Sequence, residues 1–179
     1  MSVRRQDPVA GILRKLYGKP CWQAQKGYSS FLTFDFGTPH IEIREPLKKI
    51  RAKSPRVRRV MSRRDAWVRG DWYLWIYICT WTLSVKGKVL ARSRSQQETI
   101  ERAVRELQGQ ALTRANVDRH TGATTFVFDF GGRLEIRQRD AMDELWTLWT
   151  PGGRILAIRG DGAYSYRRSD AADCFLPRR

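Results

Sequence analysis

The sequence predicts an α+β fold built from two tandem repeats, each a helix followed by an antiparallel meander of strands, packed on each other. Residues 1–94 form the first expected repeat and residues 95–179 the second. Three observations support this prediction. The tetrapeptide Phe-Asp-Phe-Gly occurs at 34–37 and again at 128–131, an apolar helical pattern precedes each copy, and a Trp-Thr-Leu segment follows each copy. Elements that recur in the same order indicate a duplicated unit.

Each repeat begins with a predicted helix. Asp7 supplies an N-cap before Pro8 in the first repeat, and Ser95 with Glu98 forms a capping box in the second. A glycine follows each helix and can end it. The apolar residues are spaced i, i+3, i+4 and i+7 on one helix face. They are Val9, Ile12, Leu13 and Leu16 in the first repeat, and Ile100, Ala103, Val104 and Leu107 in the second.

Further strands follow the tetrapeptide in each repeat: a return strand, a tryptophan-containing strand and a final strand after a glycine turn. Such strand-turn-strand units form an antiparallel meander, whose apolar face the leading helix can cover. One repeat alone would bury a small core, so we expect the two repeats to pack against each other. The expected strands are Ile41–Arg44, Trp81–Leu83 and 87–91 in the first repeat, and Leu134–Arg137, Trp146–Leu148 and 152–157 in the second.

The repeated tetrapeptide contains Asp-Phe-Gly, which holds magnesium in protein kinases. The other kinase motifs, a G-x-G-x-x-G loop and His-Arg-Asp, do not occur in the sequence. Only two histidines are present, and neither belongs to a Ser-His-Asp, Cys-His or zinc-ligand pattern. Asp35, Glu42, Asp129 and Glu135 recur at matching positions of the two repeats, which favours a role in strands and turns over a nuclease site made of scattered carboxylates. We therefore predict a binding protein that is no enzyme and uses no cofactor or metal.

The chain is strongly basic, with a formal net charge of +16 and a pI near 10.6. Residues 1–94 contain 21 Lys+Arg and 6 Asp+Glu, whereas residues 95–179 contain 13 and 12, so the fold of a repeat does not require the excess. No apolar run is long enough to span a bilayer, and the N-terminus lacks the apolar stretch of a secretory signal. Cys21, Cys79 and Cys174 show no paired spacing. We therefore expect a cytoplasmic protein with reduced thiols.

Much of the excess charge lies in a basic helical insertion of the first repeat, at about residues 45–71. The segment between Arg44 and Trp81 has 36 residues, and the matching gap in the second repeat has 8. Ser54-Pro55 predicts the start of a helix, and Gly70 its end. We expect this helix to be amphipathic and seated on the sheet by its apolar side chains, Val57, Val60, Met61 and Val68.

We predict that this insertion binds nucleic acid, either DNA or RNA, or another polyanion, because arginine matches phosphate oxygens and a basic face releases counterions. Trp67 is placed to stack on an unpaired base. An acidic protein surface is the alternative partner, and a solvated charged face is the third interpretation. The predicted binding residues are Lys48, Lys49, Arg51, Lys53, Arg56, Arg58, Arg59, Arg63, Arg64 and Trp67.

The segment at 72–81 is rich in tryptophan and tyrosine and forms a second candidate surface. Apolar residues on both faces are typical of a central strand that is buried from both sides. An aromatic strand flanked by arginines is also typical of the stacking surfaces of single-strand binders. The sequence leaves both interpretations open. The aromatic residues are Trp72, Tyr73, Trp75, Tyr77 and Trp81.

The second repeat resembles small uncharacterised bacterial domains that share a Leu-x-Gly entry, an F-x-x-G-x-x-L-x-I strand pair, a W-x-L strand and a glycine-rich end. These motifs stand here at Leu107–Gly109, Phe128–Ile136 and Trp146–Leu148. The resemblance covers about residues 105–166, and residues 14–92 in outline. Some of these domains are thought to be immunity proteins of bacterial toxin systems. The resemblance implies a binding scaffold without catalysis, and a second hypothesis: an immunity protein, or a subunit of a bacterial defence or anti-defence complex, that caps an acidic partner.

Overall fold

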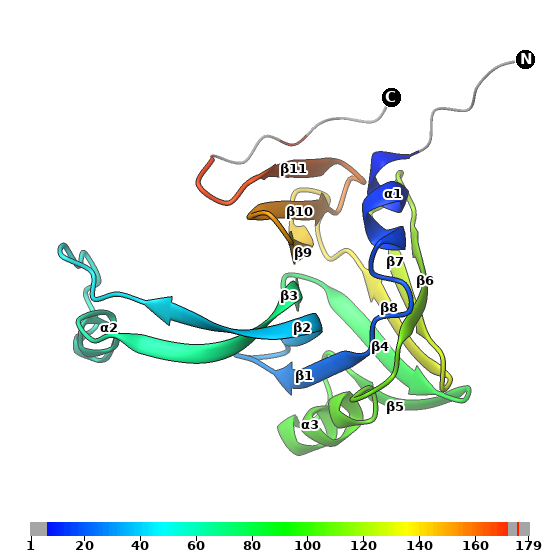
Figure 1. Ribbon diagram of the computed structural model, residues 1–179. Helices are drawn as coiled ribbons and strands as arrows, with labels where there is room; N and C mark the ends of the chain where they lie inside the picture. The colour runs from blue at the N-terminus through cyan, green and yellow to red at the C-terminus, as the bar shows by residue number, and fades with distance from the viewer. Residues whose placement is uncertain (1–6, 172–174, 176–179) are drawn as a thin grey trace, which may run out of the picture.

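The structure is a computed structural model that describes residues 7–171 and 175 (Figure 1). The described residues form three helices and eleven strands, which confirms the mixed α+β class. None of the described helices is long and apolar enough to cross a membrane. In chain order the elements are α1 Pro8–Arg14, β1 Cys21–Lys26, β2 Leu32–Arg44, α2 Pro55–Met61, β3 Asp65–Ile76, β4 Thr80–Val85, β5 Lys88–Arg92, α3 Gln97–Arg105, β6 Leu112–Val117, β7 Thr124–Phe128, β8 Gly132–Arg137, β9 Glu144–Thr150, β10 Arg154–Arg159 and β11 Tyr164–Arg168.

The strands form two antiparallel sheets. The six-stranded sheet has the order β1-β2-β3-β9-β10-β11, and the five-stranded sheet has the order β5-β4-β8-β7-β6. Alternate side chains of each strand enter one shared hydrophobic core. Trp146 of the first sheet meets Phe126 of the second at a ring-centroid distance of 5.6 Å, and its indole N–H donates to Thr124 Oγ1 at 2.9 Å. The two sheets are thus packed through their inner faces.

Each sheet combines strands from both halves of the sequence. Strands β1–β3 of the first half join β9–β11 of the second, and β6–β8 of the second half join β4 and β5 of the first. The expected meander of each half is therefore divided between the sheets. This arrangement brings the tryptophan strands of both halves into sheet centres, where Trp81 and Trp146 are buried. The boundary between residues 94 and 95 separates the halves in sequence but not in space.

The two halves meet at a reciprocal set of backbone hydrogen bonds around the bridge between Pro20 and Ala111. Gly18 N donates to Leu112 O at 2.8 Å, and Gly109 N donates to Cys21 O at 2.7 Å. Each of the helices α1 and α3 also packs on a strand of the other half: α1 of the first half packs on β6, and α3 of the second half packs on β1. Reciprocal contacts of this kind are the pattern of a two-fold axis.

Strand register shows that the two Phe-Asp-Phe-Gly copies lie at different places in the fold. Phe34 pairs with Leu74, and Phe126 pairs with Leu134, with corresponding strand neighbours on both sides. Asp35 therefore matches Val127, two positions before Asp129. By the same register Leu134–Arg137 matches Leu74–Tyr77, which differs from the expected match with Ile41–Arg44. The repeated letters therefore do not mark equivalent positions of the two sheets, because the strand pairing of Phe34 and Phe126 defines a different correspondence.

A two-stranded arm projects from the six-stranded sheet (Figure 1). Strand β2 pairs with β1 only as far as Phe36, and β3 pairs with β9 only from Tyr73 onward. Between these points, β2 and β3 pair with each other alone, out to Arg44 and Asp65. Helix α2 lies at the far end. We call residues 37–71 the arm, and residues 45–64 its tip. The matching connection in the other sheet is the short β7–β8 turn, residues 129–131.

Helices α1 and α3 begin close to where the sequence predicts. Asp7 Oδ1 accepts a hydrogen bond from Val9 N at 3.0 Å, so the predicted N-cap of α1 is confirmed. Helix α3 is capped by Gln96, and the capping box expected from Ser95 does not form. Ser95 Oγ instead accepts a hydrogen bond from Arg92 N at 3.0 Å. Of the predicted inward-facing residues of both helices, all but the partly buried Ile12 are buried.

Candidate nucleic-acid interface

The nine predicted lysines and arginines all lie at the tip of the arm. The helix among them begins at Pro55 as predicted, although Ser54 makes no capping hydrogen bond through its side chain. It ends at Met61, well before the expected Gly70, because residues from Asp65 onward are strand β3. Arg58 and Arg59 stand in the last turn of the helix, where the helix dipole favours positive charge. The tip therefore presents its cations on a short helix and the loops beside it.

The amphipathic seating expected for α2 is absent. The helix has no buried residue, and Val57 and Val60 are 38% and 48% exposed. It is held instead by the ends of the arm strands: Leu47 N donates to Met61 O at 2.9 Å, and Arg44 Nη2 donates to Val60 O at 3.1 Å. The apolar residues of α2 could be identified in the sequence. Their position at the end of the arm, away from the body, could not.

Positive charge is concentrated in the arm and largely unpaired there. Residues 38–70 contain eleven Lys+Arg and three Asp+Glu, which accounts for +8 of the formal net charge of +16. Of the nine predicted tip cations, Arg64 alone forms an ion pair with a described carboxylate, Glu45 at 3.0 Å. Eight cations therefore remain available to an external anion.

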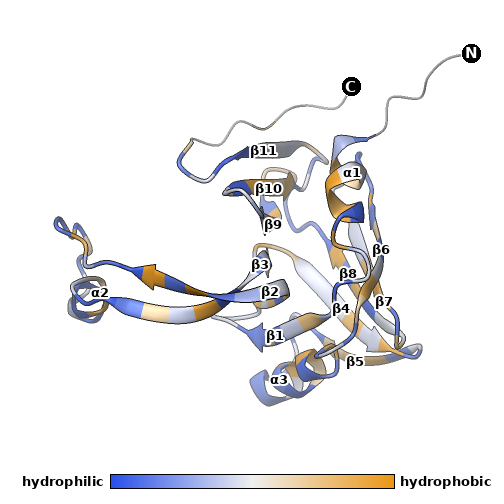
Figure 2. Cartoon of the chain, viewed as in Figure 1, coloured by the Kyte–Doolittle hydropathy of each residue, from blue (hydrophilic) through white to orange (hydrophobic). Residues whose placement is uncertain are grey.

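The shaft of the arm has one polar and one apolar face. Trp67 lies on the polar face, where its indole N–H donates to Glu42 Oε2 at 2.9 Å and its ring lies 5.8 Å from the Arg44 guanidinium. These contacts hold Trp67 in the shaft, outside the cationic tip. On the opposite face Ile41 and Val68 are paired, and Ile43 is paired with Ala66. All four are exposed, and Figure 2 shows hydrophobic residues in both arm strands. We call these four residues the apolar stripe.

The base of the arm is fixed by a buried carboxylate. Asp35 is 1% exposed and accepts a hydrogen bond from Gly70 N at 2.7 Å. Arg69 lies between Asp35, at 3.5 Å, and Glu42, at 3.7 Å, and its guanidinium stacks 3.8 Å above the Tyr73 ring. Burial raises the pKa of Asp35, while the Gly70 amide and Arg69 act to lower it. The sequence indicated a role for Asp35 in strands and turns, but not its contact with Arg69, because that contact depends on the pairing of β2 with β3.

A cavity of about 580 Å³ opens between the base of the arm and the six-stranded sheet. Arg69, Tyr73 and Trp149 line it together with the polar side chains of His40, Glu42 and Asp71. His40 Nδ1 lies 3.9 Å from Asp71 Oδ1.

The aromatic strand has two different faces, and the core interpretation is confirmed for one of them. Trp72, Leu74 and Ile76 are buried in the core. Tyr73 and Trp75 point to the outer face of the sheet and are half-buried. There they join aromatic side chains from other segments. The rings in mutual contact on this face are Tyr28, Phe31, Tyr73, Trp75, Tyr77 and Trp149.

Comparison of the chain with protein-family models, with curated proteins and with solved structures finds no significant match. The functional argument therefore depends on the geometry of the chain itself. Within the part of the chain that the structure describes, no group of three or more His, Cys, Asp or Glu side chains is arranged to hold a metal ion.

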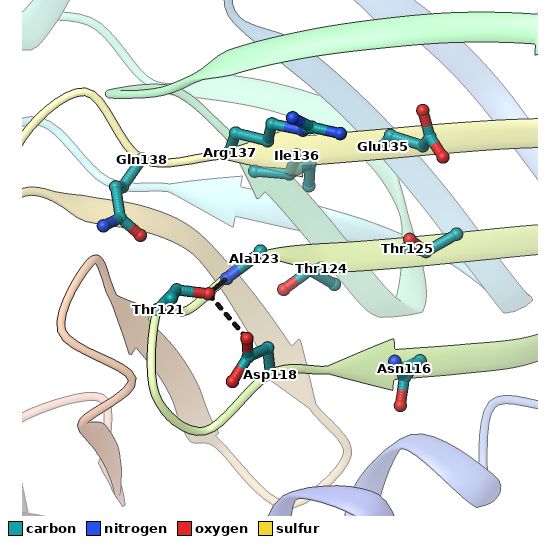
Figure 3. A pocket seen from close by; sticks show the side chains of 10 residues that line it. All are labelled: Asn116, Asp118, Thr121, Ala123, Thr124, Thr125, Glu135, Ile136, Arg137 and Gln138. Atoms are coloured by element: carbon teal, nitrogen blue, oxygen red, sulfur yellow. Dashed lines mark hydrogen bonds between the residues drawn. The ribbon is translucent and has the colours of Figure 1, made fainter.

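A second cavity, of about 470 Å³, lies over β7 and β8 on the other sheet (Figure 3). One of its charged lining groups, Asp118, is engaged within its own turn, where its carboxylate accepts hydrogen bonds from His120 N at 2.7 Å and Thr121 Oγ1 at 3.0 Å. These hydrogen bonds lower the pKa of Asp118. The carboxylate therefore serves the β6–β7 turn, and the cavity does not share the cationic character of the arm.

Proposed function

We propose that the protein binds nucleic acid through the tip of the arm, mainly at the phosphate backbone and with little sequence specificity. The observation that carries this proposal is the set of eight tip cations without a described carboxylate partner, on an element that projects from the body. Solubility alone does not account for such a set, because mutual repulsion opposes bringing like charges together. Phosphates relieve that repulsion and release their counterions on binding.

The shape of the arm supports the same proposal. A two-stranded β-ribbon fits a nucleic-acid groove, and several DNA-binding proteins use one. Arginine presents a planar fork of donors that matches phosphate oxygens. Arginines on α2 and on the loops around it approach a backbone from several directions, which suits contacts that do not depend on base sequence.

A salt titration tests the proposal. Binding of a fluorescein-labelled 20-base-pair duplex is measured by anisotropy at a series of salt concentrations. About five phosphate contacts give a log–log slope of roughly −4 to −5. An absence of binding at low salt contradicts the proposal.

A matched pair of variants locates the site. Replacing Arg56, Arg58, Arg59 and Arg63 by Gln is expected to abolish binding and to leave the fold unchanged, because all four side chains are exposed. The control replaces four exposed arginines of the second half and removes the same charge. If both variants lose affinity equally, net charge is responsible and the tip is not the site. The control residues are Arg102, Arg105, Arg114 and Arg137.

The apolar stripe favours a second candidate function, binding to a protein. Ile41 is 70% exposed and Ile43 is 59% exposed, on a ribbon face that no described residue covers. Exposed apolar residues beside cations fit an acidic partner with an apolar centre, as expected for an immunity protein or a subunit of a defence or anti-defence complex. Co-purification with the product of an adjacent gene, lost in Ile41→Thr/Ile43→Thr but kept in the four-arginine control, supports this candidate.

We also propose that the two halves are copies of one ancestral unit. The reciprocal hydrogen bonds at Pro20 and Ala111, the exchanged helices and the matching registers support this relation. An ancestral unit that exchanged its last strands with a second copy would have been a symmetric dimer, which is the commonest symmetric assembly.

A further inference from the structure

We propose that the outer face of the six-stranded sheet is a stacking platform for unpaired bases, so that the preferred ligand is single-stranded nucleic acid. This inference rests on the proposed function, because the arm supplies the phosphate contacts. The platform consists of the six outer-face aromatic residues, which we call the aromatic row. They are, in spatial order, Tyr28, Phe31, Tyr77, Trp75, Trp149 and Tyr73.

The rings of the aromatic row form one continuous series. Successive ring-centroid distances from Tyr28 to Tyr73 are 6.2, 5.9, 5.0, 6.0 and 5.3 Å. The series ends at Arg69, whose guanidinium lies 3.8 Å from the Tyr73 ring centroid. Tyr28, at the other end, is 86% exposed. Aromatic faces and arginine planes in series are the surfaces on which single-strand binders stack successive bases.

The row lies where a ligand can reach it. Strands β3 and β9 are the two central strands of the six-stranded sheet, and Trp75 and Trp149 project from their outer face. Helices α1 and α3 make their main contacts with β6, β1 and β5, which are all edge strands. Neither helix is therefore placed across the centre of this face.

The fold does not need aromatic residues at these positions. Strand register matches four of the six to residues of the five-stranded sheet, whose strands follow the same course. The side chains there are polar and also lie outside the core. A requirement of the fold would apply to both sheets, so the aromatic row has a separate cause. The matches are Tyr73 to Arg133, Trp75 to Glu135, Tyr77 to Arg137 and Trp149 to Ser84.

The row is continuous with the arm, which places bases and phosphates on one path. Strand β3 carries the arm shaft at its start and Tyr73 and Trp75 near its end. At ~3.3 Å per residue, the stretch from Arg69 to Tyr77 extends about 26 Å, enough for several nucleotides. The cavity at Tyr73 and Trp149 holds the carboxylates of Glu42 and Asp71, which repel phosphate but accept hydrogen bonds from base amino groups. A base therefore fits this cavity, while the phosphates turn toward the cationic tip.

Rows of aromatic side chains also bind neutral sugars, but the charge of this chain favours a polyanion. Residues 38–70 of the arm beside the row hold +8 of the formal net charge. A neutral oligosaccharide would gain nothing from those cations, whereas a single strand uses both surfaces at once.

The test compares two probes on the full chain. A fluorescein-labelled single-stranded 20-mer of mixed sequence and the same strand annealed to its complement are titrated by anisotropy at one low salt concentration. We expect the single strand to bind at least about 10-fold more tightly than the duplex, because each stacked base adds affinity that a paired base cannot give.

Three variants test whether the aromatic row causes the preference for the single strand. Trp149→Ser installs the residue that stands at the matching position of the other sheet, and Tyr28→Ala removes an exposed ring that the core does not need. Each is expected to weaken single-strand binding by about 5- to 150-fold and to leave duplex binding unchanged. Phe130→Ala removes a 67% exposed ring on the β7–β8 turn and is expected to change neither. Thermal unfolding confirms that all three variants are folded.

The outcomes separate this inference from the proposed function. Equal affinity for both probes, with both affinities lost on the four-arginine replacement at the tip, overturns the platform and leaves the proposed function standing. No binding of either probe contradicts the proposed function itself. Binding of chitohexaose or maltohexaose that depends on Trp149, without single-strand selectivity, overturns the platform in favour of a sugar site.

Discussion

Asp35 is a buried carboxylate at the base of the arm. Its carboxylate is buried in a strand of the sheet, and burial raises its pKa above the ordinary value of 3.8 despite the Gly70 amide and Arg69. A raised carboxyl pKa means that the folded state holds the proton more tightly than the unfolded state. The stability that Asp35 contributes is therefore fully present below pH 3.8 and is lost as the pH rises through the raised pKa.

Asp35→Asn tests this pH dependence, because the amide oxygen can still accept the Gly70 hydrogen bond while the charge is absent. The free energy of unfolding of the wild type, relative to the variant, is expected to fall as the pH rises from 3.5 through the titration of Asp35, and then to stay constant up to pH 7. Urea unfolding at intervals of half a pH unit measures it. A difference that does not change with pH contradicts the assignment.

Two glycines respond in opposite directions to alanine. A Cβ at Gly70 would lie 2.4 Å from Phe36 O, a backbone atom that cannot move alone, so Gly70→Ala is expected to destabilise by about 1–3 kcal/mol. A Cβ at Gly11, inside α1, meets nothing within 4 Å, so Gly11→Ala is expected to stabilise by about 0.5–1 kcal/mol. Both are measured by urea denaturation. If the two substitutions changed the free energy of unfolding equally, the arm would not be tightly packed at Gly70.

Some residue environments could be predicted from the sequence, and others could not. Val9 and Ile100 were assigned correctly to the core, because helical spacing is a local property. Asp35 was not, because its burial depends on a strand register that links it to Gly70 across the sheet. Trp149 was missed although the copies differ there: Trp-Thr-Leu is followed by Ser84 in the first half and by Trp149 in the second. That difference was the available indication of the aromatic row.

The arm is an element that can be removed without entering the core. Its last paired residues are Arg44 and Asp65, and none of the residues between them is buried. Replacing residues 45–64 by Asn-Gly closes this hairpin with a two-residue turn. The thermal midpoint is expected to change by less than about 4 °C, and duplex binding is expected to be lost. Circular dichroism and anisotropy measure the two effects.

This prediction requires that the deletion leave the rest of the protein folded. A deletion that unfolds the protein would show that the tip packs on the body, contrary to its exposure. A folded deletion that keeps its affinity for duplex would place the nucleic-acid site elsewhere.

The basic composition of this element was predictable, and its form was not. The start of α2 followed from Ser54-Pro55, because a cap and a first-turn proline act locally. The long hairpin depends on Ile41 pairing with Val68 and Glu42 with Trp67, contacts between residues far apart in sequence. The alternation of apolar and polar residues in both segments is typical of strands, but helical spacing at Val57, Val60 and Val68 was given more weight.

At the scale of the whole molecule, the interleaved halves imply one cooperative unit. Every sheet needs strands from both halves, and one hydrophobic core joins them. The full chain is therefore expected to unfold in a single transition, with coincident curves from circular dichroism and tryptophan fluorescence. Residues 1–94 and 95–179 expressed separately are expected not to fold as monomers, and to form a 1:1 complex when mixed. Light scattering after size exclusion measures the complex, and a half that unfolds cooperatively as a monomer contradicts it.

The exchange of strands could not be predicted from one sequence. Under the proposed duplication both copies carry the same apolar pattern, so the last strands of each copy fit either their own sheet or the partner's. The choice depends on how the chain passes from β3 to β4 and from β8 to β9, where the residues 77–79 and 138–143 lead from one sheet to the other. The mixed α+β class and the aromatic strand were within reach of the pattern alone.

The short β7–β8 turn gives this scaffold a use in engineering. The arm and the turn connect matching strands, so residues 129–131 mark an attachment point for a second arm on the opposite sheet. Grafting residues 37–71 there would give the molecule two cationic tips, one on each sheet. Where one polyanion cannot reach both tips, such a molecule would crosslink two strands. Where one polyanion can reach both, it would gain avidity from the high effective concentration of the second tip.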